Sequence, residues 1–369
     1  MPPALLRLGP VCSVLLLAPL GALALSSSPP SPRAGSAGFS WPLLVREPAR
    51  QEHAADRVRT PLDNPDANKL VIPQHAKALV IAPHPDDETL AAAGLIGRVL
   101  EQRGSVRVVF ATNGDGYAEA VAAQRKGRRL TPEDFRRYGR QRQAEAQEAL
   151  LSLGIPASWI VFLGYPDGGI DDLWATHWAE GQPFVSPFTR LSQAVDGTEQ
   201  GPKPAYVGSN LAENLADLIR AWQPTMVVFP DPRDQHLDHC TLGVFVLEAV
   251  REVAKDRCAP MPQLLGYLVH FPEYPGTPVW PDLARRSGVC GAKDNTGWAH
   301  RVPWTYLALE SEEVAAKDAA LSRYASQLQV MRAFLLQFVR PMEWFSILGR
   351  EEVATIPLQH AARSHRGAR

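Results

Sequence analysis

The sequence is poor in several features that define other classes of protein. It holds four cysteines in 369 residues and no Cys-x-x-Cys pair, which excludes a disulfide scaffold and disfavours a thiolate zinc site. It has neither a P-loop nor a Gly-x-Gly-x-x-Gly motif, so nucleotide use is not expected. It also lacks a Gly-x-Ser-x-Gly elbow and a catalytic-cysteine signature, and this disfavours a covalent acyl-enzyme route.

The charge and the composition narrow the possibilities further. There are 38 Lys and Arg residues against 39 Asp and Glu, and the formal net charge of -1 gives no reason to expect nucleic acid as a partner. The chain is 45% hydrophobic and 21% charged, as is usual for a globular protein with a sizeable core. The length suggests about two domains at ~150 residues each, although single α/β domains are often longer.

The amino terminus has the features of a secretory signal peptide. Arg7 precedes an apolar run from Val11 to Leu25, and Ala22-Leu23-Ala24 fits a small-residue cleavage site. We expect export to the periplasm, the cell envelope or the medium, with an uncleaved N-terminal anchor as the alternative. The predicted organisation is a signal peptide (1–24), a Pro- and Ser-rich linker (25–66), one domain (67–358) and a basic tail (359–369).

Short apolar runs alternate with amphipathic stretches through the predicted domain. The runs predict strands at 78–82, 106–111, 159–163, 225–229 and 264–270, and the stretches predict helices at 90–101, 135–153, 210–222 and 239–253. This order is typical of an α/β fold, with a Rossmann-like, doubly wound, largely parallel sheet and helices on both faces. Residues 171–208 form an aromatic-rich insertion, interpreted either as a lid or substrate wall or as a surface loop with its own aromatic cluster.

Two of the predicted strands end in clusters of histidine and aspartate. The first is followed by His84-Pro85-Asp86-Asp87-Glu88, and the fourth by a segment that contains His236, Asp238 and His239. His84 and Asp87 stand at i and i+3 across a tight turn, so both could reach one ion. Because the strands of such a sheet end at one edge, we expect the clusters to meet there. Two histidines and one aspartate suit a catalytic zinc site with one open position. Each motif alone could be a turn or a helix cap.

The two clusters together resemble the PIG-L/LmbE-like zinc-dependent de-N-acetylases. Four other stretches resemble motifs of that family, and the resemblance covers roughly residues 75 to 335. They are Thr112-Asn113-Gly114-Asp115-Gly116, Arg142 with Glu145-Ala146 and Leu153-Gly154-Ile155, Leu163-Gly164-Tyr165-Pro166-Asp167-Gly168, and Lys317 with Ser326-Gln327.

The resemblance implies a role for each matching residue. The implied zinc ligands are His84, Asp87 and His239, and Asp86 would be the general base. His236 would be a cation or proton donor near the leaving amine, and Asp238 would orient a neighbouring histidine. The implied substrate residues are Arg142, Asp115 and Asp167. Tyr267 would be either an oxyanion donor or a packed strand aromatic, and His270 is equally open.

The function that follows is that of a hydrolase acting on linear amides. We expect an exported N-deacetylase that removes the acetyl group from an N-acetylglucosamine-containing glycan or glycoconjugate through metal-activated water. Zinc is the expected cofactor, and other divalent metals also suit the ligand set. Two alternatives stay open: a deacylase of a non-sugar amide, and a non-catalytic glycan-binding protein on the same fold. The oligomeric state and a disulfide between Cys258 and Cys290 stay open as well.

Overall fold

The computed structural model describes residues 69–179, 181–195, 203–256, 260–271, 274–275, 290 and 303–355. All of them belong to one compact unit, Arg57–Arg369. The expected signal peptide, linker and basic tail lie outside the described residues, and so does Cys258. Among the helices of the described ranges, none combines the length and the apolar character that a membrane crossing requires.

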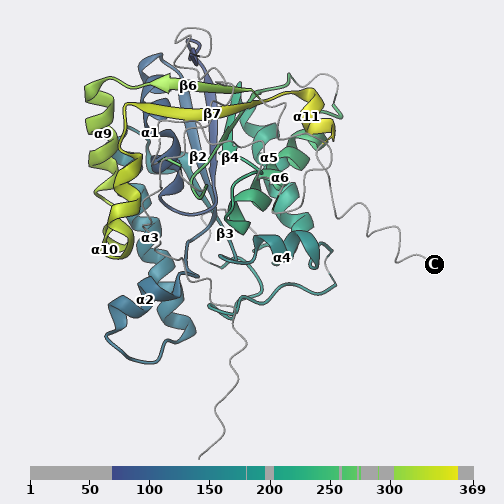
Figure 1. Ribbon diagram of the computed structural model, residues 1–369. Helices are drawn as coiled ribbons and strands as arrows, with labels where there is room; N and C mark the ends of the chain where they lie inside the picture. Colours follow the sequence, from purple (N-terminus) through teal and green to yellow (C-terminus); the bar gives the residue numbers. More distant parts are fainter. Residues whose placement is uncertain are drawn as a thin grey trace, which may run out of the picture. The chain divides into compact units, whose positions relative to one another are not determined.

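A seven-stranded sheet lies at the centre of this unit (Figure 1). Its order is β3-β2-β1-β4-β5-β7-β6. The strands are β1 (Lys77–Ala82), β2 (Ser105–Thr112), β3 (Ile160–Tyr165), β4 (Met226–Pro230), β5 (Gln263–Tyr267), β6 (Trp304–Ala308) and β7 (Met342–Leu348). Strands β1 to β5 are parallel to their neighbours within this group, whereas β7 is antiparallel to both β5 and β6. The predicted doubly wound, largely parallel sheet is therefore confirmed.

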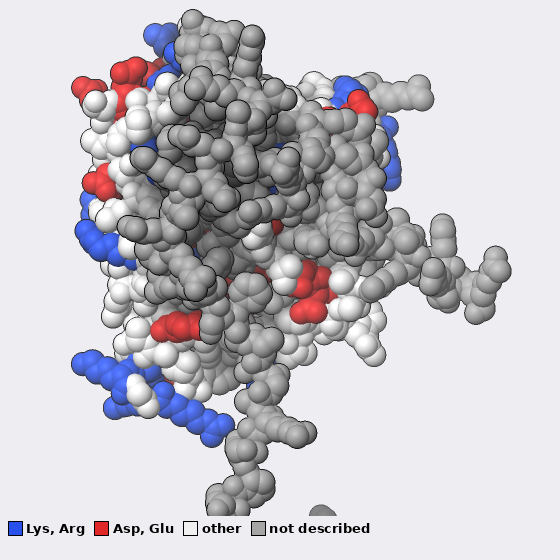
Figure 2. Space-filling view, viewed as in Figure 1, with Lys and Arg blue, Asp and Glu red and all other residues white. Residues whose placement is uncertain are grey.

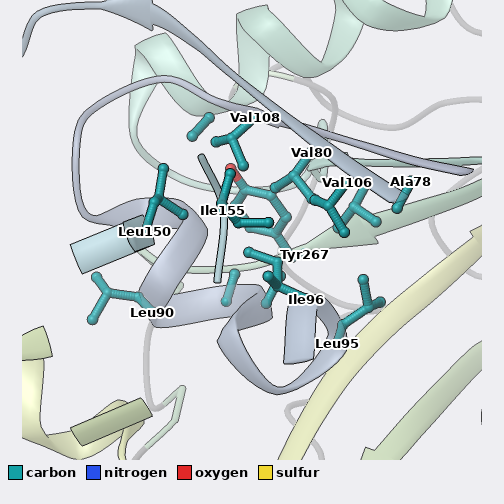
Figure 3. Packing of buried hydrophobic residues seen from close by; sticks show 14 of the residues in the cluster. Ala78, Val80, Leu90, Leu95, Ile96, Val106, Val108, Leu150, Ile155 and Tyr267 are labelled. Carbon is teal, nitrogen blue, oxygen red and sulfur yellow. The ribbon is translucent and has the colours of Figure 1, made fainter. Parts of the chain in front are cut away.

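Helices cover both faces of the sheet. They are α1 (Asp87–Glu101), α2 (Ala118–Arg125), α3 (Pro132–Ser152), α4 (Ile170–Ala175), α5 (Gly208–Trp222), α6 (Leu237–Val253), α9 (Ser311–Leu321), α10 (Ala325–Leu335) and α11 (Arg350–Thr355). In β1, Val80 belongs to the hydrophobic cluster with α1, α3, α9 and α10, and Ile81 to the cluster with α4, α5, α6 and α11. This alternation follows from the two-residue period of a strand. Figure 3 shows the first cluster, which includes Tyr267.

Several boundaries differ from the sequence prediction by a few residues, and two of them lie beside the histidine and aspartate clusters. Helix α1 begins at Asp87, earlier than the predicted start at Leu90, because the carbonyl of Asp86 already accepts hydrogen bonds from the backbone N–H groups of Thr89 and Leu90. The predicted strand 264–270 was too long. It ends at Tyr267 because the following N–H groups of residues 269 and 270 donate to a side chain instead of a strand.

Helix α1 is interrupted at Ala92, whose backbone angles are φ -141° and ψ 15°. Beyond this break, the N–H groups of Gly94 and Leu95 donate to the two carboxylate oxygens of Glu343 on β7, at 2.8 and 2.9 Å. The ammonium of Lys317 on α9 donates to the same carboxylate at 2.8 Å, and both side chains are buried. The three elements are therefore joined by one buried ion pair.

Candidate functional site

The clusters meet where the strand order of the sheet reverses. The chain passes from β1 to β2 and β3 on one side, while β4 lies on the other side of β1. In doubly wound folds, ligands bind in the crevice between the loops that follow the two strands at such a reversal. In this sheet those strands are β1 and β4. The two motifs of the sequence stand directly after these two strands.

The turn after β1 is closed by hydrogen bonds in both directions. The N–H of Asp87 donates to the carbonyl of His84 at 3.3 Å, and the N–H of His84 donates to Asp87 Oδ2 at 3.0 Å. This turn places His84 Nδ1 3.1 Å from the same carboxylate oxygen. The i and i+3 side chains therefore face one point, as their spacing predicts.

The loop after β4 is held by a buried ion pair. Arg233 donates to both carboxylate oxygens of Asp231 at 2.6 and 2.7 Å, and Ser346 of β7 donates to the same carboxylate at 2.5 Å. The loop then leads into α6, where the Nδ1 atom of His236 caps the helix by accepting the N–H of Asp238. This arrangement orients the first turn of α6, including His239, towards the turn after β1.

The expected ligand set forms one buried cluster. Asp87 Oδ2 lies 3.1 Å from His84 Nδ1 and 3.2 Å from His239 Nε2. One ligand atom from each of the three residues lies within 4.8 Å of the other two. His239 is fully buried, and among the described residues neither of its ring nitrogens has a hydrogen-bond partner of suitable geometry. Because buried nitrogens without partners are costly, the donor set fits a divalent cation such as zinc.

A second combination, His84 with His236 and Asp238, is also compact enough to hold an ion. Its polar atoms have other partners, however. The carboxylate of Asp238 accepts the backbone N–H groups of Gly168 and Ile170 at 2.7 and 3.1 Å, and His236 Nδ1 is used as the helix cap. The first set is therefore the better candidate, and Asp238 is placed to orient the ring of His84, whose Nε2 lies 3.2 Å away.

The electrostatics of the cluster favour positive charge. Burial lowers the pKa of His239, but Asp87 and Asp234 outweigh it and raise this pKa to about 9. Burial raises the pKa of Asp87, yet His239 and His84 bring it well below its usual value. Burial likewise opposes the charged form of His84, while Asp167 and the other nearby carboxylates raise its pKa well above 6.5. A cation placed here meets several carboxylates at close range.

Asp86 is held in an unusual backbone conformation beside this cluster. Its φ of 141° lies in a region that residues other than glycine rarely adopt. The carboxylate turns away from the helix cap and accepts a hydrogen bond from Arg142 Nη2 at 3.0 Å. Burial raises the pKa of Asp86 from 3.8 to about 7, although Arg142 opposes the rise and Asp87 adds to it. These are the surroundings of a carboxylate that can accept a proton near neutral pH.

The predicted substrate residues have different surroundings. Arg142 is buried and also donates to the carbonyls of Pro85 and Gly114, at 2.5 and 3.1 Å, so it braces the loop that carries Asp86. Asp115 is buried in the loop that follows β2. The hydroxyl of Tyr267 donates to the carbonyl of Ile81 at 3.0 Å within the core. That bond uses its only hydrogen, so the structure favours the packed-aromatic interpretation of Tyr267 over the oxyanion donor.

Asp234 received no role from the sequence and the role of His270 was left open, and the structure places both residues at the cluster. The carboxylate of Asp234 accepts three backbone N–H groups, those of His236 at 3.0 Å, Val269 at 2.8 Å and His270 at 3.0 Å. The ring of His270 lies 4.8 Å from the ring of His239 and stacks on Phe334. The available signal was the place of Asp234 in the same loop as His236.

The aromatic side chains of the insertion divide into two groups. Trp174 and Trp178 pack against Phe245 of α6 and belong to the core. Phe188 lies against Gly116, where an added Cβ would come within 3.0 Å of its ring. The N–H of Gly116 donates to Asp167, whose other oxygen lies 3.1 Å from His84 Nε2. The insertion therefore contributes both a packed cluster and one ring beside a loop of the site.

The two cysteines in the described part of the chain lie close to this site. Cys240 follows His239 and is buried, and Cys290 is partly buried. Both are free thiols, and each sulfur lies 3.7 Å from the hydroxyl of Thr241. The possible pairing of Cys258 with Cys290 falls outside the described residues.

Residues 79–250 match the PIG-L family, which is described as GlcNAc-PI de-N-acetylase. The chain carries a PIG-L domain. The match begins within β1 and ends within α6, so it includes both loops of the cluster.

Relatives of the PIG-L domain include two proteins described as 1D-myo-inositol 2-acetamido-2-deoxy-alpha-D-glucopyranoside deacetylase. The protein from Segniliparus rotundus is 28% identical over 185 residues, which is 49% of this chain and 52% of the relative. The protein from Mycobacterium leprae is 25% identical over 280 residues, 69% of this chain and 81% of the relative. The match thus spans about half the length of the first of these relatives.

A solved structure, N,N'-diacetylchitobiose deacetylase from Pyrococcus horikoshii, is also similar to this chain. It has a TM-score of 0.46 and 17% sequence identity, and the similarity covers 78% of this chain and 88% of that one.

Proposed function

We propose that the protein is an exported, zinc-dependent hydrolase that removes the acetyl group from an N-acetylglucosamine-containing glycan or glycoconjugate. The observation that carries this proposal is the buried set of His84, Asp87 and His239, in which neither ring nitrogen of His239 has a hydrogen-bond partner of suitable geometry among the described residues. The family description and the activity of the named relatives support an amide of an amino sugar as the substrate.

A zinc ion bound by His84, Asp87 and His239 would supply Lewis-acid polarisation of the acetamide carbonyl and would acidify water. Asp86 is the group placed to take the proton of the attacking water, because it adjoins the ligands and its pKa is raised to about 7. Arg142 holds the carboxylate through its 3.0 Å hydrogen bond and so fixes the direction from which the proton is accepted.

His236 is placed to stabilise the oxygen of the amide as negative charge develops. Its Nδ1 accepts the N–H of Asp238, which leaves the hydrogen of the neutral ring on Nε2. Burial and the charges of His84 and His239 lower the pKa of His236 to about 4. A neutral ring that carries its hydrogen on Nε2 can donate to the developing oxyanion, and Asp86 can return its proton to the departing amine.

The test is release of acetate from N-acetylglucosamine, its glycosides and its oligomers by zinc-loaded protein, with and without a chelator. Release that the chelator abolishes and added zinc restores is the expected result. Asp86→Asn is the matched variant, since it keeps the size of the side chain and all three ligands. A zinc-loaded protein that releases acetate from none of these compounds would contradict the proposed substrate.

The export component rests on Arg7, the apolar run that follows it and the small residues at positions 22 and 24. N-terminal sequencing of the protein from its native cells tests it. A mature chain that begins soon after residue 24 is expected, and a retained amino terminus in the membrane fraction would instead support an anchor.

A further inference from the structure

Helices α2 and α3 form a hairpin that begins at the candidate site and leads away from it. Helix α2 starts directly after the loop 112–116, and Arg142 of α3 is bonded to the carbonyl of Gly114 in that same loop. The connection between the helices turns through Lys126 and Gly127, which both have positive φ. In Figure 1 the connection lies at the lower left, beyond α2.

Positive charge is concentrated at this turn. The sequence 125–129 reads Arg-Lys-Gly-Arg-Arg and is called the basic tip here. Arg125 pairs with Asp134. Lys126, Arg128 and Arg129 are exposed, and among the described residues none has an acidic partner. Figure 2 shows Lys and Arg side chains gathered over this part of the molecule.

The neighbouring acidic residues do not neutralise the basic tip. Asp134 is shared by Arg125 and Arg137, and Glu133 is shared by Arg136 and Arg140. Each of these carboxylates therefore already faces two guanidinium groups. The basic tip therefore carries an excess of positive charge, although the whole chain has a formal net charge of -1.

The basic tip is close to the site but does not reach its centre. Eight residues of α2 span ~12 Å at 1.5 Å per residue, so the tip lies roughly that far from the loop 112–116. Mobile ions screen exposed charges over ~8 Å at physiological salt. Any ligand group that the basic tip contacts would therefore lie well away from the reacting amide.

We infer that the basic tip binds anionic groups of an extended substrate, so that the preferred substrate is an N-acetylglucosamine residue within an anionic glycan. This inference rests on the proposed function and specifies its substrate class. A membrane surface fits the hairpin less well. The large hydrophobic side chains that are exposed in the described residues are Val71, Leu151, Val185, Val195, Leu237 and Leu336, and none of them belongs to the turn. Interfacial anchoring requires such side chains beside the basic ones.

The test compares two oligomers of equal length. One is a neutral oligomer of N-acetylglucosamine, and the other alternates N-acetylglucosamine with glucuronic acid. In the triple variant Lys126→Gln/Arg128→Gln/Arg129→Gln, kcat/KM for the anionic oligomer is expected to fall roughly tenfold through KM, because exposed charge contacts contribute a few-fold each. The loss should shrink at high salt. The kcat/KM for the neutral oligomer should not change.

The control variant Arg103→Gln/Arg220→Gln/Lys255→Gln removes the same amount of charge elsewhere on the surface. It should leave kcat/KM unchanged for both oligomers.

Three results would overturn the inference: equal losses for both oligomers, no loss for either, or the same loss in the control variant. Failure of the proposed function is recognised separately. Binding of the anionic oligomer to the Asp86→Asn protein is measured by calorimetry, with and without the triple substitution, and does not depend on turnover. Binding of phosphatidylglycerol vesicles through the basic tip, without any effect on the oligomer, would replace the inference with membrane attachment.

Discussion

The buried ion pair between Lys317 and Glu343 provides a sharp test of how α1 is held. Replacing Lys317 with Met keeps an unbranched chain of similar length but leaves the carboxylate of Glu343 buried without a cation. Two backbone donors, the N–H groups of Gly94 and Leu95, remain. Removing one partner of a buried pair lowers the free energy of unfolding by about 3–5 kcal/mol. Because the two remaining hydrogen bonds still stabilise the carboxylate, we expect a loss of about 3 kcal/mol.

Replacing the other partner of the pair, in Glu343→Gln, should lower the free energy of unfolding by at least as much. It leaves the ammonium of Lys317 buried and gives the two N–H donors of α1 a single carbonyl oxygen in place of two carboxylate oxygens. The double variant Lys317→Met/Glu343→Gln contains no uncompensated charge. Its loss should therefore be smaller than the sum of the two single losses by about 1–3 kcal/mol, as expected for side chains in direct contact.

Urea unfolding of the wild type and the three variants measures these differences in the free energy of unfolding. The comparison requires that the slope of this free energy against urea concentration is the same in all four proteins. Acetate release per folded molecule should change little, because Asp87 lies in the first turn of α1, before the break at Ala92. A loss below about 1 kcal/mol in Lys317→Met would refute the reasoning, since it would show that the pair contributes no more than an exposed one.

Other substitutions test the site itself. Asp86→Asn should lower kcat about 10²–10⁴-fold while zinc content stays at the wild-type value, because general-base catalysis contributes that much; normal kcat with zinc bound would remove Asp86 from this role. His239→Ala should abolish stoichiometric zinc binding, as measured by metal analysis after dialysis. Retained zinc would instead indicate that His84, His236 and Asp238 hold the ion. Tyr267→Phe should lose only about 1 kcal/mol of stability and keep its kcat; a fall of about 10²–10³-fold would instead identify an oxyanion donor.

Most of the sheet could be predicted from the sequence because its central strands are buried on both faces and form continuous apolar runs. The predicted contact between His84 and Asp87 follows from local geometry alone. Strands β6 and β7 were not anticipated. They alternate buried and partly buried residues at the edge of the sheet, and such short patterns resemble loops when read alone. The hydrogen bonds that begin α1 at Asp87 also depend on the turn that precedes it.

The parts of the site that were missed depend on contacts between distant segments. Asp234 gains its place from N–H groups of residues 269 and 270, which no local pattern relates to it. The position of Tyr267 on a strand left open whether its hydroxyl faced the site or the core, and only the contact with Ile81 decides this. The basic tip is visible in the sequence, but its distance from the site requires the lengths of α2 and α3.

The separation of the candidate ligands along the chain has a consequence for folding. The candidate ligands His84 and His239 are 155 positions apart, and β1 must pair with β4 before the two loops that carry them meet. An unfolded chain offers an ion only the local pair of His84 and Asp87, so a cation would bind almost exclusively to the folded state. At 100 times its dissociation constant, such an ion adds about 2.7 kcal/mol to the stability. Metal supply would then set the lifetime of the protein as well as its activity, and β1 and β4 would separate more readily in metal-starved cells.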